Sequence, residues 1–144
     1  MIILGCDHGG FKLKEQIKTF LTKEGESIVD VGAFKFDKED DFSKFVLLMR
    51  SAFSKDNSSK IIAVCHSGIG MSIGLNKYKG IRCALGVNEE EIKLAREHND
   101  INAIAFGEKD MSIRKAKKII RAFLETESLG GKYKRRMDEI ELKN

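Results

Sequence analysis

The 144-residue chain contains no proline and only three cysteines. Without proline, its turns must be built from Gly, Asn, Asp and Ser. The cysteines, Cys6, Cys65 and Cys83, are widely separated and include no C-x-x-C pair, so we expect a reduced, cytoplasmic protein. No apolar run approaches the ~20 residues that a membrane span requires, and residues 1–5 predict a strand rather than a signal peptide. We therefore expect no membrane insertion.

The charge is mildly basic, with 26 Lys and Arg residues against 22 Asp and Glu residues and a net charge of +4. Much of the excess lies late, in residues 115–118 and 132–136. A small phosphorylated ligand needs only two or three convergent cations. Because acidic residues such as Asp138 and Glu139 follow the basic run, and no nucleic-acid motif accompanies it, we expect no nucleic-acid binding.

Apolar runs alternate with helical patterns along the whole chain. The runs span residues 2–4, 27–31, 60–64, 81–87 and 102–106. This alternation predicts a single α/β domain over residues 1–144, built on a doubly wound five-stranded parallel sheet with helices on both faces. We take the Rossmann-like strand order to be 2-1-3-4-5. Residues 132–144 are too polar for the core, so we expect a C-terminal dimerisation segment or a solvated face.

The most informative segment is residues 63–72, where an apolar run stops at Cys65 and Ser67 before a helical pattern begins. Gly68 and Gly70 let the chain turn with its N–H groups open, as in anion-binding loops. This layout predicts a reactive group beside an oxyanion site. The alternative is a buried structural cysteine at a strand-to-helix turn.

Strands 1 and 3 are neighbours in the expected sheet, and ligands bind outside the carboxyl ends of such strands. Asp7 and His8 follow strand 1, so we expect them to border the same crevice as Cys65. The polar segment 96–100 lies at the far edge, and His98 reaches a crevice most easily on a second subunit. As alternatives, Asp7 caps a helix, His8 is a surface residue, and His98 with Asn99 caps a helix C-terminus.

Two further features have simpler interpretations. The acidic stretch 36–42 is interpreted as a solvated connection. The three histidines do not pair at i, i+4, and no Cys/His cluster has zinc spacing, so we expect no metal.

Five segments resemble the family of type B ribose-5-phosphate isomerases and galactose-6-phosphate isomerases. They are residues 5–15 (GCDHGGFKLKE), 65–73 (CHSGIGMSI), 76–85 (NKYKGIRCAL), 96–102 (REHNDIN) and 130–136 (GGKYKRR). The resemblance runs from about residue 2 to 140. It implies a homodimer, or a tetramer built from dimers, with cofactor-free and metal-free active sites shared between two subunits.

The resemblance also implies an aldose–ketose isomerisation of a sugar phosphate through a cis-enediolate. A base must move a proton between C2 and C1, and donors must stabilise the enediolate oxygen. By resemblance, Cys65 is that base, and Asp7 with His98 of the partner assists ring opening. Ser67 and the amides of four following residues cradle the enediolate. Those residues are Gly68, Ile69, Gly70 and Met71. A second branch of the family has a glutamate base at the position of Met71, so this chain fits the thiol branch.

The remaining positions concern the phosphate and the sugar. His8, Lys132 and Arg136 match phosphate-binding positions, Lys109 stands where many relatives carry an arginine, and Asn99 shapes the pocket. The chain departs from the family pattern at His66, where glycine is usual, and at Phe42-Ser43, where Tyr-Pro is common. Lysine at 109 and 132 replaces a forked guanidinium by a point charge.

Together these observations predict an enzyme that interconverts ribose 5-phosphate and ribulose 5-phosphate. One alternative is an isomerase of another sugar phosphate, such as galactose or allose 6-phosphate or a tetrose phosphate. The other is a non-catalytic phosphosugar-binding module of the same fold.

Overall fold

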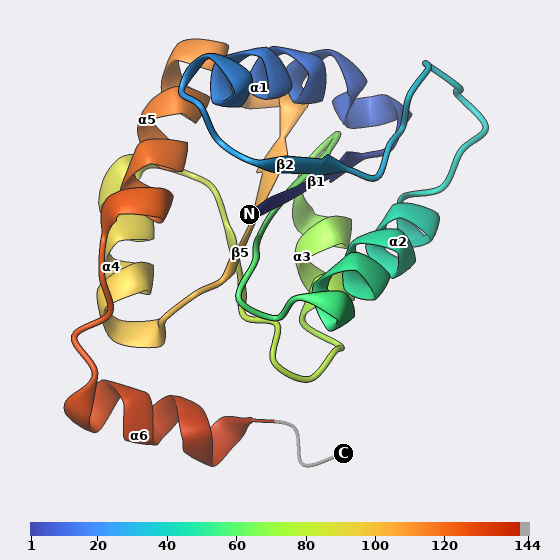
Figure 1. Cartoon of the computed structure of the whole chain (residues 1–144). Helices are drawn as coiled ribbons and strands as arrows, with labels where there is room; N and C mark the ends of the chain where they lie inside the picture. The colour runs from blue at the N-terminus through green and yellow to red at the C-terminus, as the bar shows by residue number, and fades with distance from the viewer. Residues whose placement is uncertain (142–144) are drawn as a thin grey trace.

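Strands and helices alternate along the chain in the computed structural model, which describes residues 1–141 (Figure 1). The strands are β1 (Ile2–Cys6), β2 (Ile28–Asp30), β3 (Lys60–Cys65), β4 (Cys83–Leu85) and β5 (Ala103–Gly107). The helices are α1 (Phe11–Lys23), α2 (Phe42–Lys55), α3 (Ile69–Leu75), α4 (Glu89–Asn99), α5 (Ile113–Glu125) and α6 (Gly131–Ile140). Two short 3-10 turns, η1 (His8–Gly10) and η2 (Glu108–Asp110), follow β1 and β5. Residues 142–144 of the polar tail lie outside the described residues.

All strand pairs in the sheet are parallel, and the strand order is β2-β1-β3-β5-β4. The doubly wound α/β prediction is confirmed, but the expected order of the last two strands is wrong. The apolar β5 is buried along Ala103–Phe106, whereas the three residues of β4 are only partly buried or exposed. The more apolar strand therefore takes the inner position beside β3, and the short, less apolar strand forms the edge.

Helices cover both faces of this sheet. Helices α2 and α3 pack against each other on one face, while α1 and α4 pack against α5 on the other (Figure 1). The inner strand β3 is buried from Ile61 to Cys65, as expected for a parallel strand covered on both sides. The core therefore lies along β1, β3 and β5, whose carboxyl ends emerge next to one another.

Helices α4 and α5 each begin at an N-cap residue whose side chain accepts a hydrogen bond. Asn88 accepts the Glu91 N–H at 2.8 Å at the start of α4, and Ser112 accepts the Lys115 N–H at 3.2 Å at the start of α5. Such side-chain acceptors satisfy N–H groups that have no partner within the helix. The apolar stripe of α5 is buried at Ala116, Ile119, Ile120, Ala122 and Phe123.

Helix α6 has no buried residue and contacts α4, so the expectation that the tail is too polar for the core is confirmed. It lies below the sheet in Figure 1, away from the end of β5 that leads to α5. Among residues 1–141, no helix has the length and apolar character that a membrane span requires.

Helix α1 begins in very close contact with β3. A Cβ on Gly10, the N-cap of α1, would lie 2.5 Å from the carbonyl carbon of Val64 and 2.6 Å from its oxygen. No side chain fits between these backbones. Gly10 therefore sets the distance between the loop after β1 and the end of β3.

We predict that Gly10→Ala destabilises the protein by about 1–3 kcal/mol, because the added methyl group pushes α1 away from β3. The midpoint of urea unfolding, followed by circular dichroism, measures this loss. Ser51→Ala, at an exposed position of α2, is the control and should change stability by less than about 0.5 kcal/mol. Equal midpoints for Gly10→Ala and the control would contradict the close packing.

Candidate active site

Two loops that follow the neighbouring strands β1 and β3 meet at the carboxyl end of the sheet. Cys6 at the end of β1 pairs with Val64 of β3, and the Asp7 N–H donates to the Val64 carbonyl at 3.3 Å. Asp7 therefore lies beside the loop that begins at Cys65. The structure brings together the two loops that the sequence predicts at this crevice.

Cys65 is 5% exposed, and its Sγ accepts a hydrogen bond from the Gly68 N–H at 3.0 Å. Gly68 has a φ of +80°, a left-handed conformation that glycine adopts without strain. The Ser67 Oγ accepts the Ile69 N–H at 3.3 Å. The first N–H groups of a helix have no acceptor within it. A thiol, a hydroxyl and the donors of the first turn of α3 thus share one corner.

Gly70 and Met71 complete this first turn of α3. A Cβ on Gly70 would lie 3.0 Å from Cζ of Phe42, so the Phe42 ring, 40% exposed, covers this part of the turn. The Met71 side chain is fully buried in the core, and Met71 offers the site its backbone alone. His66, the other departure from the family pattern, is exposed.

The other two cysteines are unsuited to proton transfer. Burial raises the pKa of the Cys6 thiol to about 12, and burial likewise raises the pKa of Cys83 to about 12. Both thiols stay protonated at neutral pH, and a protonated thiol is neither a base nor a nucleophile. Of the three thiols, Cys65 is therefore the one that remains a candidate base.

Asp7 is 8% exposed, and its Oδ1 is buried without a hydrogen-bond partner. Gly10 is the N-cap of α1, and Asp7, which precedes η1, makes no side-chain capping hydrogen bond, so the alternative that Asp7 caps the first helix is wrong. Burial is the main cause that raises the pKa of the Asp7 carboxyl, and the charge of Asp40 raises it further. The protonated form of Asp7 is therefore more accessible than that of an ordinary exposed carboxyl, which makes Asp7 a candidate for proton exchange.

His8 binds a residue that the sequence analysis did not single out. The Asp40 Oδ1 accepts the His8 N–H at 2.8 Å and lies 2.7 Å from Nδ1 of the same residue. The Asp40 side chain is 8% exposed. The interpretation of stretch 36–42 as a solvated connection is therefore wrong at Asp40. Three consecutive acids, residues 39–41, precede α2, and no local sequence signal distinguishes Asp40 among them.

Asp7, His8 and Asp40 form the one group within residues 1–141 whose potential metal ligands converge, with the ligand atoms within 4.8 Å of one another. The His8 Nδ1 and the Asp40 Oδ1 are hydrogen-bonded to each other. A metal ion bound through these two atoms would have to break that bond. We therefore assign these two atoms to a histidine–carboxylate pair.

The corrected strand order brings η2 to the same corner. Gly107 of β5 pairs with Cys65, and the Lys109 N–H donates to the His66 carbonyl at 3.2 Å. The exposed Lys109 side chain therefore belongs to the same end of the sheet as the thiol.

Glu108 fixes the position of this turn. Its Oε2 accepts the Leu13 N–H at 2.9 Å and so supplies an acceptor to the first turn of α1 from a distant segment. A small pocket of about 170 Å³ lies between the Ser67 loop and η2, with Ser67, Gly107 and Lys109 in its lining. Sequence reasoning missed Glu108, because tertiary contacts of this kind leave no local pattern.

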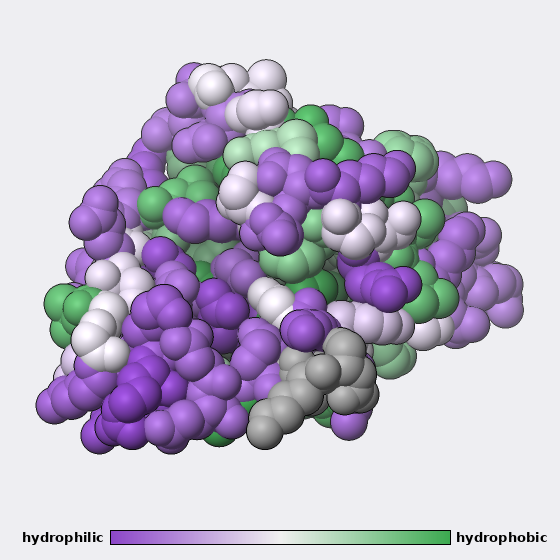
Figure 2. All heavy atoms as spheres, turned by 60° about the horizontal axis from the view of Figure 1, so that its bottom comes forward, coloured by the Kyte–Doolittle hydropathy of each residue, from purple (hydrophilic) through white to green (hydrophobic). Residues whose placement is uncertain are grey.

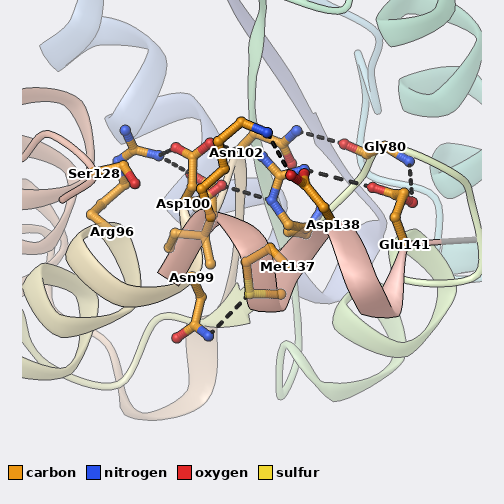
Figure 3. Close-up of polar contacts among 12 residues, drawn as sticks. Gly80, Arg96, Asn99, Asp100, Asn102, Ser128, Met137, Asp138 and Glu141 are labelled. Carbon is orange, nitrogen blue, oxygen red and sulfur yellow. Dashed lines mark hydrogen bonds and ion pairs between the residues drawn. The ribbon is translucent and has the colours of Figure 1, made fainter. Parts of the chain in front are cut away.

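His98 and Asn99 lie at the end of α4 and contact α6. The His98 ring stacks on Tyr133, with ring centroids 4.3 Å apart and planes 4° from parallel. The Asn99 Nδ2 donates to the Met137 Sδ at 3.3 Å (Figure 3). The residue at the C-cap of α4 is Asp100, with a φ of 44°, so capping by His98 and Asn99 is not their role.

The expected phosphate ligands Lys132 and Arg136 lie in this second cluster. Their cationic groups are 5.2 and 5.8 Å from the centroid of the Tyr133 ring, and both side chains are exposed. Figure 2 shows hydrophilic side chains gathered over α6 at the lower left, with hydrophobic patches above it. The cations of α6 thus accompany His98 and not Cys65.

Polar contacts hold this second cluster in place. Arg96 binds Asp100 at 2.8 Å, and the Gly80 N–H donates to Glu141 at 3.0 Å beyond the end of α6 (Figure 3). Helix α4 leads to the amino end of β5, whereas Cys65 lies at the carboxyl end of β3. Four residue steps separate Ala103 from Gly107, or roughly 13 Å along β5, so the two clusters lie toward opposite ends of the sheet.

The model of the Ribose/Galactose Isomerase family matches residues 2–140 of this chain. The chain belongs to the ribose/galactose isomerase family. The resemblance of the five sequence segments is therefore confirmed along nearly the whole chain.

Named members of the family have similar sequences. Ribose-5-phosphate isomerase B of Mycolicibacterium paratuberculosis is 38% identical over 138 residues, covering 95% of this chain and 87% of that protein. The enzyme of the same name from Escherichia coli is 32% identical over 139 residues, covering 96% of this chain and 93% of that protein.

Solved family structures share the fold. Ribose-5-phosphate isomerase B from Mycoplasma genitalium with bound ribulose-5-phosphate superposes with a TM-score of 0.92 at 32% identity, covering 96% of this chain and 92% of the other. The Clostridium thermocellum structure gives a TM-score of 0.91 at 35% identity, covering 96% and 93% of the two chains. The chain thus shares its fold with these structures over nearly all of the length compared.

Proposed function

We propose that this family member interconverts ribose 5-phosphate and ribulose 5-phosphate in the cytoplasm, without a metal or organic cofactor. The relatives named above support the pentose phosphate, as does the ribulose-5-phosphate bound in the Mycoplasma genitalium structure. The observation that carries the proposal for this chain is the corner that holds Cys65 beside Ser67 and the first turn of α3.

In the proposed chemistry, one base removes a proton from C2 and returns it to C1. The Cys65 thiolate takes the proton from C2 of the open-chain aldose, the C2 electrons form a C1–C2 double bond, and the C1 oxygen becomes the negative oxygen of a cis-enediolate. The proton then returns to C1, a proton moves from the C2 hydroxyl to the C1 oxygen, and C2 becomes the ketose carbonyl. The Ser67 hydroxyl and the N–H groups of residues 68–71 donate to the enediolate oxygen. Met71 has no ionisable group, so of the two positions that carry a base in this family only Cys65 can act as one here.

Ring opening precedes this step. The buried Asp7 carboxyl, with its raised pKa, exchanges a proton with the sugar ring, and His98 of a second copy assists from the other side. His8 and Lys109 bind the phosphate together with Lys132 and Arg136 of the second copy, because α6 lies beside His98 in each chain. Asn99 contributes to the wall around the sugar hydroxyls.

The active protein is proposed to be a homodimer with shared sites, or a tetramer of two such dimers. The pocket of about 170 Å³ beside Ser67 is smaller than the roughly 300 Å³ of a typical ligand site, so one chain forms only part of the binding site. Large apolar side chains surround this corner and remain exposed, as expected of a surface that another subunit covers. They are Phe42, Leu47, Leu48, Ile69, Ile73, Leu85 and Val87.

The substitution Cys65→Ala tests the base. We predict that kcat for ribose 5-phosphate falls by roughly 10²–10⁴-fold, because the group that removes the C2 proton is lost. KM should change little, since the thiol is not a phosphate ligand. Cys83→Ala is the matched control and should keep normal activity.

The outcome of this assay separates the alternatives. Near-normal turnover by Cys65→Ala would refute the thiol mechanism. A wild-type protein that isomerises galactose or allose 6-phosphate or a tetrose phosphate in preference to the pentose has a different specificity. Saturable binding of ribose 5-phosphate without turnover would identify a binding module.

Mixed dimers test whether the site is shared. Cys65→Ala and His98→Ala, each inactive alone, are co-expressed with different affinity tags. With shared sites, a heterodimer has one site with both lesions and one intact site, so random pairing restores roughly a quarter of wild-type activity. If both residues acted within one chain, every site would carry a lesion and no activity would return.

A further inference from the structure

Asp40 is the one acidic residue of the loop between β2 and α2 that turns inward. Its neighbours Asp37, Glu39 and Asp41 are exposed, whereas the Asp40 side chain is 8% exposed. Burying a carboxylate is unfavourable unless hydrogen bonds replace its water. Here one oxygen, Oδ1, accepts both the backbone N–H and the ring of His8, at 2.8 and 2.7 Å.

These contacts hold His8 from a segment 32 residues away in the sequence. The ring of Phe36, from the same loop, meets the His8 ring edge-on, with centroids 6.2 Å apart. This loop therefore contacts both the backbone N–H and the ring of His8. The His8 side chain is still 36% exposed, so its free nitrogen remains accessible to a ligand.

We propose that Asp40 is a positioning residue that fixes the orientation and the charge of His8, so that His8 presents its Nε2–H to the phosphate of the substrate. An ionised carboxylate can only accept hydrogen bonds, so the His8 Nδ1 must carry a proton. Nε2 is then the nitrogen that remains for the ligand. The inference rests on the proposed function only in its last step, the identity of the phosphate ligand.

The electrostatics agree with this geometry. The hydrogen bond to Asp40 is the main cause that raises the pKa of His8, and the charge of Asp7 raises it further. Asp7, on the same loop as His8, and Asp40, on the facing loop, are the titratable groups beside the ring. A histidine that keeps both protons donates a charge-assisted hydrogen bond to a phosphate dianion.

Asp40 also links His8 to Asp7. The Asp40 Oδ2 and the Asp7 Oδ1 are both buried without a partner, and the three residues offer ligand atoms within 4.8 Å of one another. The negative charge of Asp40 raises the pKa of Asp7, in addition to the effect of burial. The charge of Asp40 thus favours the protonated forms of both His8 and Asp7.

The experiment is a pH titration of the full-length, substrate-free protein labelled with ¹⁵N-histidine and followed by NMR. His8→Gln assigns the His8 signals. The neutral wild-type ring is expected to be the Nδ1–H tautomer, and its titration midpoint should fall to lower pH in Asp40→Asn, which removes the charge but keeps an oxygen acceptor. Glu39→Gln, with the same charge change on the same loop, should leave it unmoved.

Binding of inorganic phosphate at pH 8 is the second measurement. Its affinity should fall about tenfold in Asp40→Asn, the loss of one charge-assisted hydrogen bond, and stay unchanged in Glu39→Gln. An Nε2–H tautomer in the neutral wild-type protein, or an unmoved His8 midpoint in Asp40→Asn, overturns the proposal. The tautomer of His8 in the wild-type protein tests the proposal even if Asp40→Asn does not fold. If these two measurements give the expected results but the protein does not isomerise ribose 5-phosphate, the proposed function is rejected and the role of Asp40 is retained.

Discussion

The parallel pairing of β3 between β1 and β5 is the constraint on which the site depends. The strand is buried on both faces, and each neighbour is held by a ladder that fixes its register, with Cys6 opposite Val64 and Gly107 opposite Cys65. Three loops must therefore leave the sheet side by side. The thiol, the Asp7 loop and η2 meet because the parallel register places the carboxyl ends of β3, β1 and β5 next to one another.

The same geometry divides the chemistry of one chain into two halves. A parallel sheet returns the chain to its amino end after each helix, so α4 places His98 where β5 begins, and α6 adds its cations there. The Cys65 half lies at the other end of the strands. In a two-fold dimer, each site would combine the Cys65 cluster of one chain with the His98 cluster of the other. The exposed apolar side chains around α3 would then contact the second chain.

Sequence patterns predicted the strands, the helix-covered sheet and the meeting of Asp7 with Cys65, because each depends on local apolar periodicity and on which strands end in unusual residues. They did not predict the position of β5, since the sequence runs that form β4 and β5 are both apolar. Only the burial of Ala103–Phe106 in the folded chain distinguishes β5 from the shorter, less buried β4. Asp40 and Glu108 escaped notice for a different reason. An acidic residue in a loop has the same sequence signature whether it faces water or a distant histidine.

Hydrogen exchange is the most direct test of metal-independent enediolate chemistry on a pentose phosphate. The wild-type protein is incubated with ribose 5-phosphate in D₂O containing EDTA, and NMR follows the C2 proton together with the appearance of ribulose 5-phosphate. We expect the C2 proton signal to be lost as the ketose forms, with deuterium from the solvent appearing at C1. A C2 proton that persists, with no ketose formed, would contradict this chemistry.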